Sequence, residues 1–249
     1  MGLIYENEKP AKIYKYVTLL DGKLIIDSST LKFTNPSEFN DPFDCDNELL
    51  QFENIGKIDQ HVFDDYEELK KMSPLLSFDN FLKLYEPAIN KKIESTRVCC
   101  FSSNENIGNI LMWSHYANKH KGICFQFDNN FEKKFIDLDV EEELSEGKVN
   151  YHFDGKLNYL AENKKDGHTW VFVNKAKEWK YEDEYRFMLI NKKEIQRFDP
   201  LFLRGVYFGV NVTDEERIDF IALCKQNNYL HLKFYLGVKQ GLSLRFIEI

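Results

Sequence analysis

Short β-rich segments recur along this chain at irregular intervals, and helical patterns separate only some of them. The segment Lys12–Val17 alternates apolar and polar residues, and the segments 184–190 and 203–210 are apolar and β-rich. Thr213 and Glu216 have the spacing of a capping box, so a helix is expected to follow. Strands without regular βα alternation indicate an α+β fold. The sequence therefore predicts a mixed, mostly antiparallel sheet at the core.

A longer helical pattern lies between residues 58 and 94, where apolar residues recur three and four positions apart and Pro74 and Pro87 break or kink the pattern. This stretch is predicted to form an inserted helical lobe, and a shorter helix is predicted over residues 169–179. A chain of 249 residues can bury one sizeable core. Because no Gly-, Ser- or Pro-rich linker divides it, residues 1–249 are expected to form a single α+β domain.

The charge balance indicates which classes of partner this chain can bind. Acidic residues outnumber basic ones by 41 to 33, for a formal charge of -8. Such a chain repels polyphosphates unless its positive charge is segregated, so generic nucleic-acid binding is disfavoured. No apolar run approaches the roughly 18 residues of a membrane span, and the first residues lack the profile of a signal peptide. We expect a cytoplasmic protein that engages no membrane, and the sequence identifies no protein partner.

Metal chemistry is not expected from the sequence. The five cysteines form no CxxC pair and the six histidines are dispersed, which disfavours structural zinc. Phosphate-binding glycine loops of the Rossmann and P-loop types are absent as well. No metal site and no firm cofactor are therefore predicted.

Aromatic residues make up 15% of the chain, and several stand beside polar residues in compact clusters. The clusters lie on the first strand, in a turn-rich loop, at a strand end before residue 103 and on a short helix after residue 109. Each residue type also has an ordinary structural role, because rings fill cores, Asx residues fix turns and a strand-end serine caps a helix. Both interpretations stay open. The candidate binding residues in these clusters are Lys15, Tyr16, Asn40, Asp41, Ser102, Trp113, His115 and Tyr116.

The alternation of Glu182, Glu184 and Arg186 is the sharpest of these patterns. In an extended segment the three would share one face, with two carboxylates about 7 Å apart and a guanidinium beside them. This face is either a solvated strand surface with an internal ion pair, or a site that orients a ribose hydroxyl or an attacking group. Close carboxylates raise one another's pKa, which favours the second interpretation. Glu184 and Glu182 are the candidate catalytic residues and Arg186 is a candidate binding residue.

Taken in order, these clusters resemble a bacterial family known as domain of unknown function 2971. The resemblance extends roughly from Lys12 to Leu236 and rests on six segments. They are Tyr14-Lys15-Tyr16, Phe39-Asn40-Asp41-Pro42-Phe43, Cys100-Phe101-Ser102, Met112-Trp113-Ser114-His115-Tyr116-Ala117, Lys121-Gly122 and Trp179-x-Tyr181-Glu182-x-Glu184-x-Arg186. Because members of that family are often found among mobile elements and defence genes, the resemblance implies a toxin or phage-defence effector role.

The order of these motifs is also similar to the site layout of arginine-type ADP-ribosyltransferases. That similarity implies NAD as substrate, with Lys15 holding its phosphates and Ser102 supporting the nicotinamide ribose. It further implies that Glu184 stabilises the oxocarbenium as nicotinamide leaves, assisted by Glu182, while Tyr16, Trp113 or Tyr116 offers a ring platform. The chain departs from the pattern, because the first-strand residue is Lys and the full Ser-Thr-Ser triplet is missing.

Three hypotheses follow. The first is a cytosolic NAD- or nucleotide-using enzyme that performs ADP-ribosyl transfer or NAD cleavage. The second is a non-catalytic module that binds a small molecule or a protein, which a ligand would stabilise without turnover. The third is a metal-dependent nuclease built on Asp41, Asp44 and Asp46, which the acidic charge and the lack of a basic stripe disfavour.

Overall fold

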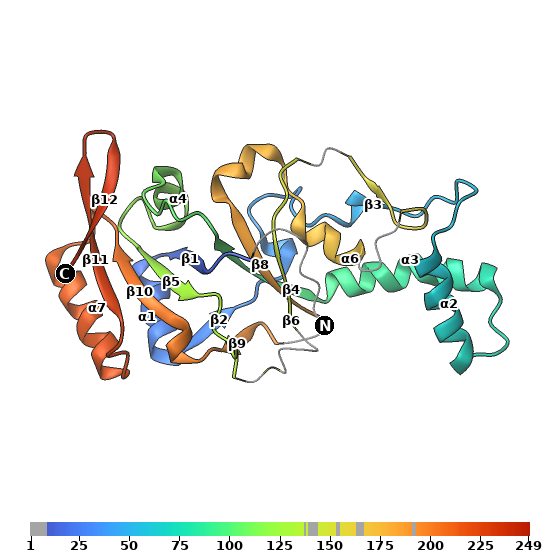
Figure 1. The fold of residues 1–249 in the computed structure, drawn as a ribbon, viewed down its shortest axis with the longest axis horizontal. Coiled ribbons are helices and arrows are strands. Elements are labelled where there is room, and N and C mark those ends of the chain that lie inside the picture. Colours follow the sequence, from blue (N-terminus) through green and yellow to red (C-terminus); the bar gives the residue numbers. More distant parts are fainter. Residues whose placement is uncertain (1–8, 137, 139–143, 153–154, 163–166, 191–192) are drawn as a thin grey trace.

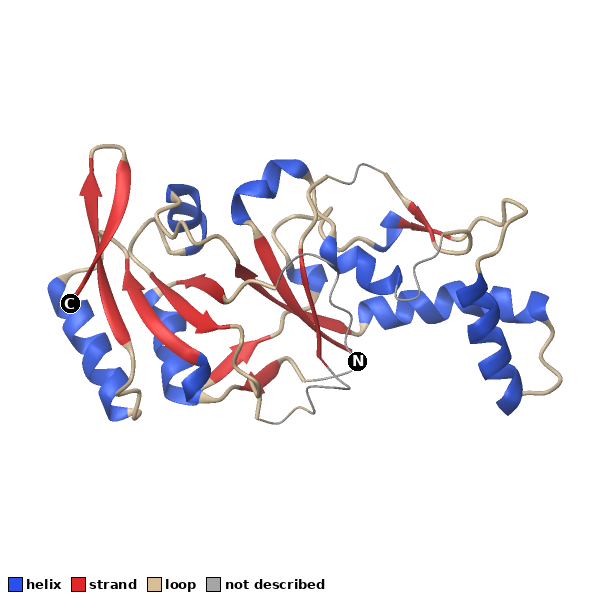
Figure 2. Cartoon of the chain, viewed as in Figure 1, coloured by secondary structure: helices blue, strands red, loops and turns tan. Residues whose placement is uncertain are grey.

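The computed structural model describes residues 9–136, 138, 144–152, 155–162, 167–190 and 193–249 (Figures 1 and 2). The helices are α1 (Leu19–Ser28), α2 (Gln60–Met72), α3 (Phe78–Glu94), α4 (Ile110–Tyr116), α6 (Gly167–Trp170) and α7 (Asp214–Gln226). The strands are β1 (Lys12–Val17), β2 (Thr30–Lys32), β3 (Leu50–Gln51), β4 (Thr96–Ser102), β5 (Ile123–Asp128), β6 (Leu144–Lys148), β7 (Leu157–Asn158), β8 (Glu184–Ile190), β9 (Ile195–Arg197), β10 (Leu203–Phe208), β11 (Lys233–Gln240) and β12 (Ser243–Glu248). Five short 3-10 helices complete these elements: Pro36–Glu38, Asn47–Leu49, Val171–Val173, Lys177–Glu182 and Pro200–Phe202.

An eight-stranded sheet forms the centre of the structure, with the strand order β12-β11-β10-β5-β1-β4-β8-β6. Strands β10 and β11 are parallel, and the other neighbouring pairs in this sheet are antiparallel. The predicted α+β class with a mixed, mostly antiparallel sheet is thereby confirmed.

The alternation of side chains gives this sheet two different buried faces. On β1, Ile13 and Val17 join the largest apolar cluster, which the rings of β5 and the buried residues of α1 and α7 complete. Tyr14 and Tyr16 point to the opposite face and pack with Met112 of α4. Since successive strand residues face opposite sides, one short strand contributes to both cores.

The predicted helical lobe is also confirmed, and α2 and α3 form it at one end of the molecule (Figure 1). Asp59 and Ser77 cap the two helices through side-chain oxygens that accept backbone N–H bonds. Pro74 lies in the connection between them, whereas Pro87 lies inside α3. The apolar face of the lobe packs in one cluster with residues of β4 and β8, so it covers part of the same sheet face as α4.

The prediction of a helix over residues 169–179 is wrong. Helix α6 ends at Trp170, a 3-10 turn follows, and a second one covers Lys177–Glu182. Asn174 adopts an extended conformation between them and donates its side-chain N–H to the Trp170 carbonyl at 2.8 Å. This bond takes up a terminal helix carbonyl and ends the helix.

The described residues include no helix that is both long and apolar enough to cross a membrane.

Candidate functional site

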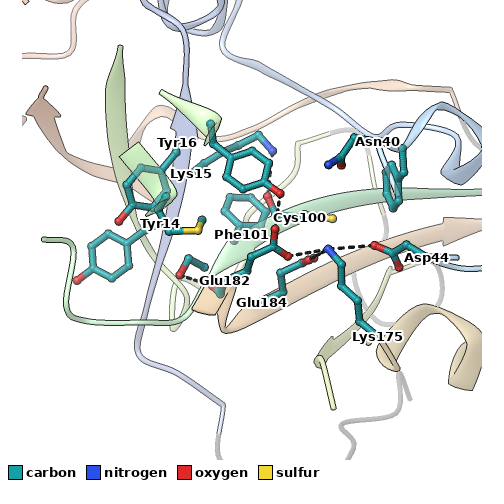
Figure 3. A pocket seen from close by; sticks show the side chains of 14 residues that line it. Tyr14, Lys15, Tyr16, Asn40, Asp44, Cys100, Phe101, Lys175, Glu182 and Glu184 are labelled. Atoms are coloured by element: carbon teal, nitrogen blue, oxygen red, sulfur yellow. Dashed lines mark hydrogen bonds and ion pairs between the residues drawn. The ribbon is translucent and has the colours of Figure 1, made fainter. Parts of the chain in front are cut away.

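A cavity of about 220 Å³ opens on the sheet face between α4 and the loop of residues 39–44 (Figure 3). Strand pairing explains why its residues converge: Tyr14 lies opposite Ser102, and Ser102 lies opposite Glu184. Directly paired residues project from the same face, so β1, β4 and β8 each contribute a side chain to one row. The lining residues are Tyr14, Lys15, Tyr16, Phe39, Asn40, Asp44, Cys100, Phe101, Ser102, Met112, Tyr116, Lys175, Glu182 and Glu184.

The floor of the cavity is a buried network of three carboxylates and two cations. Lys175 Nζ lies 2.6 Å from Glu182 Oε2, 2.6 Å from Glu184 Oε1 and 3.2 Å from Asp44 Oδ2. Arg186 donates to both oxygens of Asp44 at 2.8 and 2.7 Å, and its Nε donates to Glu184 at 2.6 Å. Three negative charges face two positive ones, so one bound proton makes the network neutral.

The electrostatics place that proton on Glu182. Burial raises the pKa of Glu182 to about 8, and the hydrogen bond and charge of Glu184 add to the rise against the opposing effect of Lys175. Burial also disfavours the ionised form of Glu184, but the charge of Arg186 and the hydrogen bonds it receives hold its pKa well below the usual range. The expectation that both carboxylates are raised is therefore wrong for Glu184, because two cations contact it. A buried acid with a pKa near neutrality beside a permanent carboxylate is typical of acid–base sites.

The backbone at Asp183 is what brings the two glutamates together. Glu182 ends a 3-10 helix and does not extend β8, which corrects the expected extended segment. Asp183 follows in the left-handed conformation, with φ of 45°. The backbone of this turn is anchored to the end of β4, because Ser102 Oγ donates to the Glu182 carbonyl at 2.7 Å and Ser103 N donates to the Asp183 carbonyl at 2.7 Å.

Tyr116, Lys15, Tyr16 and Asn40 form walls of the cavity, as the sequence predicts for binding residues. The hydroxyl of Tyr116 donates to Glu182 Oε1, and burial followed by this bond raises the pKa of Tyr116, which keeps it a donor. Lys15 Nζ donates to the Cys100 carbonyl at 3.0 Å and lies 5.2 Å from the centre of the Phe101 ring. Figure 3 shows Tyr14 and Tyr16 on one side of the cavity and Asn40, Asp44 and Lys175 on the other.

Four predicted site residues do not line this cavity. Arg186 is fully buried beneath the cavity and forms ion pairs with Glu184 and Asp44. Trp113 is fully buried, donates its indole N–H to the Ile107 carbonyl at 2.6 Å and packs edge-on against Tyr16. The carboxylate of Asp41 accepts the N–H of Phe43 at 3.0 Å and fixes a turn. His115 is exposed and lies 2.9 Å from the hydroxyl of Tyr181, at the outer side of Tyr116.

The carboxylates of the nuclease hypothesis have separate partners. Asp41 holds its turn, Asp44 pairs with Arg186, and Asp46 accepts the N–H of Glu48 at 2.9 Å. Over the part of the chain that the structure describes, no three His, Cys, Asp or Glu side chains are placed to hold a metal ion.

The sequence interpretation missed Lys175 as a site residue, and it considered Asp44 only as a carboxylate of the disfavoured nuclease. Lys175 stood inside a predicted helix, where a lone lysine is normally solvent-exposed, and its burial follows only from the break at Asn174. Asp44 belongs to the turn-rich loop that was singled out, but its sequence neighbours do not show that it reaches Arg186. A charge count could have indicated Lys175, because two carboxylates and one arginine lack one positive charge, whereas no charge count indicates Asp44.

Comparison with known proteins gives one result. The model of the family described as "Protein of unknown function (DUF2971)" matches residues 112–187, from α4 to β8, and this confirms the family resemblance over that stretch. No curated protein and no solved structure matches the chain.

Proposed function

For this chain, which carries the DUF2971 pattern from α4 to β8, we propose that the cavity is the active site of an enzyme that cleaves or transfers at an N-glycosidic bond of a nucleotide. NAD is the first candidate substrate, by ADP-ribosyl transfer or by hydrolysis. The observation that carries the proposal is the pair of glutamates at the cavity floor, one with a raised pKa and one held ionised. An NAD-consuming enzyme also fits the toxin or phage-defence role that the family resemblance implies.

The chemistry of such a bond needs two carboxylate roles. As the bond from ribose C1′ to the nicotinamide nitrogen breaks, its electron pair leaves with the nitrogen, which becomes neutral, and positive charge develops on the sugar. In the proposed mechanism the ionised Glu184 stabilises this charge. Water or another acceptor then attacks C1′, and its proton passes to the carboxylate form of Glu182.

The remaining lining residues support binding of the reacting end of the substrate. Tyr14, Tyr16 and Phe39 offer apolar and ring surface for a planar leaving group, and Lys15 is a lining cation outside the floor network. The cavity is smaller than the roughly 300–1,000 Å³ of sites for drug-sized ligands, so it would hold only the nicotinamide and its ribose. The hydroxyl of Ser102 donates to the backbone carbonyl of Glu182, so Ser102 is a positioning residue for that glutamate.

Nicotinamide release from NAD by the purified protein tests the proposal, with the variants Glu182→Gln and Glu184→Gln and the matched control Glu178→Gln. Glu178 is exposed on the 3-10 helix that Glu182 ends. We expect release by the wild type and the control and a loss of at least about 100-fold in each cavity variant, the usual contribution of a positioned acid or base. Since the base form of Glu182 is needed, the rate should rise with pH up to about 8 and then level off.

Thermal stabilisation by NAD without nicotinamide release, with and without protein acceptors, would contradict the enzyme proposal. That result would instead support the non-catalytic binding module.

A further inference from the structure

Two larger hollows adjoin the catalytic cavity, and Phe39 and Asn40 line all three spaces. The first, here called the acidic hollow, measures about 480 Å³ and is lined by residues 35–37, 39–42, 44–47, 93 and 94. The second, here called the aromatic hollow, measures about 640 Å³. It is lined by Thr34, Glu38, Phe39, Asn40, His115, Tyr116 and Trp179. These two hollows are the neighbouring spaces into which a substrate longer than the cavity can extend.

Charge distinguishes the two paths. The acidic hollow is lined by Asp41, Asp44, Asp46 and Glu94 and by no lysine or arginine. A phosphate there would meet like charge at short range, which disfavours a nucleotide. The aromatic hollow is likewise lined by no lysine or arginine, but its one carboxylate is Glu38, whose Oε2 lies 3.0 Å from the ammonium of Lys32 beside the hollow. The phosphates of a nucleotide would therefore extend toward the aromatic hollow.

The aromatic hollow also has the surface that a planar base requires. Four of its lining residues carry rings: Phe39, His115, Tyr116 and Trp179. Trp179 is half-buried, and the ammonium of Lys175 lies 4.9 Å from the centre of its ring, so the ring connects the hollow with the catalytic floor. Stacking of a base on an aromatic side chain contributes roughly 1–3 kcal/mol.

Asn40 adds a polar group that can identify a base. Its side chain is exposed and lies at the junction of the hollows, across the cavity from Tyr14 and Tyr16 (Figure 3). Among the described residues the Asn40 amide has no hydrogen-bond partner, so both its donor and its acceptor are free for a ligand. An asparagine amide can pair in two places with the edge of an adenine.

We propose that the aromatic hollow binds the second, non-reacting base of a dinucleotide whose reacting glycosidic bond lies in the catalytic cavity, with that base against Trp179 and its edge on Asn40. This inference rests on the proposed function and extends it. The substrate is a dinucleotide that occupies both spaces, and a bare nicotinamide riboside would use only the inner one.

Binding of AMP, measured by quenching of tryptophan fluorescence, tests the inference without any turnover. Trp113 and Trp170 are buried, so Trp179 is the indole that a ligand in the hollow can reach. We expect saturable quenching by AMP and none by ribose 5-phosphate. Trp179→Leu, followed by calorimetry because the fluorophore is lost, should weaken AMP binding roughly 5- to 100-fold, the equivalent of one stacking contact.

Two further variants make the test specific. Asn40→Ala changes an exposed side chain, leaves Lys175 untouched and should weaken AMP binding about 5-fold or more. Phe43→Leu removes an aromatic side chain that is 76% exposed on the same loop and lines neither hollow, so it should leave AMP binding unchanged.

The outcomes separate this inference from the proposed function. AMP binding that depends on Trp179 and Asn40, in a protein that releases no nicotinamide, retains the nucleobase site and removes only the catalytic proposal. Nicotinamide release with a KM for NAD that Trp179→Leu and Asn40→Ala leave unchanged overturns the nucleobase site. Tighter AMP binding in Glu94→Gln, a variant of the acidic hollow, would overturn the chosen path in the same way.

Discussion

The two glutamates of the cavity floor should differ sharply in what their amide variants do to stability. At pH 7 a carboxyl with a pKa of about 8 is protonated in about ten molecules for each ionised one, so Glu182 is already mostly neutral. Glutamine has nearly the shape of that neutral acid, and Glu182→Gln should change the free energy of unfolding by less than about 1 kcal/mol. Glu184 is ionised between Lys175 and Arg186, and removal of a partner from a buried ion pair costs about 3–5 kcal/mol.

Thermal unfolding followed by circular dichroism measures the difference. For a chain of this size each kcal/mol corresponds to roughly 2–4 °C, so Glu184→Gln should lower the Tm by roughly 6–20 °C and Glu182→Gln by no more than about 4 °C. Equal losses in the two variants, or a larger loss in Glu182→Gln, would refute the assignment of the proton to Glu182.

The pH dependence gives the same assignment an independent test. The folded-state pKa of Glu182 is raised from 4.5 to about 8, so the stability that its proton contributes is complete below pH 4.5 and is lost as the pH rises through 8. The wild type should therefore lose unfolding free energy over this range relative to Glu182→Gln, which has no such group. A Tm difference between wild type and variant that stays constant from pH 5 to pH 9 would contradict this reasoning.

Three further predictions concern the surroundings of the site. Lys175→Met leaves three carboxylates facing a single guanidinium, so it should lower stability by about 3–5 kcal/mol at neutral pH, as measured by urea unfolding. Tyr116→Phe removes a hydrogen-bond donor to Glu182, so the pKa of that carboxyl should rise further and the midpoint of the pH–rate profile should move about one unit upward. An unchanged profile would argue against this hydrogen bond. Gly209→Ala would place a Cβ 2.2 Å from the backbone oxygen of His120, so we expect a loss of about 1–3 kcal/mol, and a variant as stable as wild type would contradict this close approach.

The catalytic proposal rests mainly on Glu182 and Glu184 and the nucleobase proposal on Trp179 and Asn40, although Asn40 lines the cavity as well as the hollow. The cavity floor is buried and charged, whereas Trp179 and Asn40 lie at its mouth and carry no charge. Variants at the mouth therefore report on binding with little effect on folding, while variants at the floor report on chemistry and stability together.

Interactions between residues near one another in the sequence determined several of the helices and strands of this protein. Alternation in Lys12–Val17, the capping box at Thr213 and the helical spacing between residues 58 and 94 predicted elements that the structure contains, because short-range periodicity and caps act within a few residues. The motif around Glu182 and Glu184 supplied two residues that line the cavity. Tertiary structure alone decided which partners those glutamates have. Lys175 and Asp44 reach them only because a helix breaks at Asn174 and a distant loop folds over β8, and these contacts set the charge balance and therefore the opposite pKa shifts.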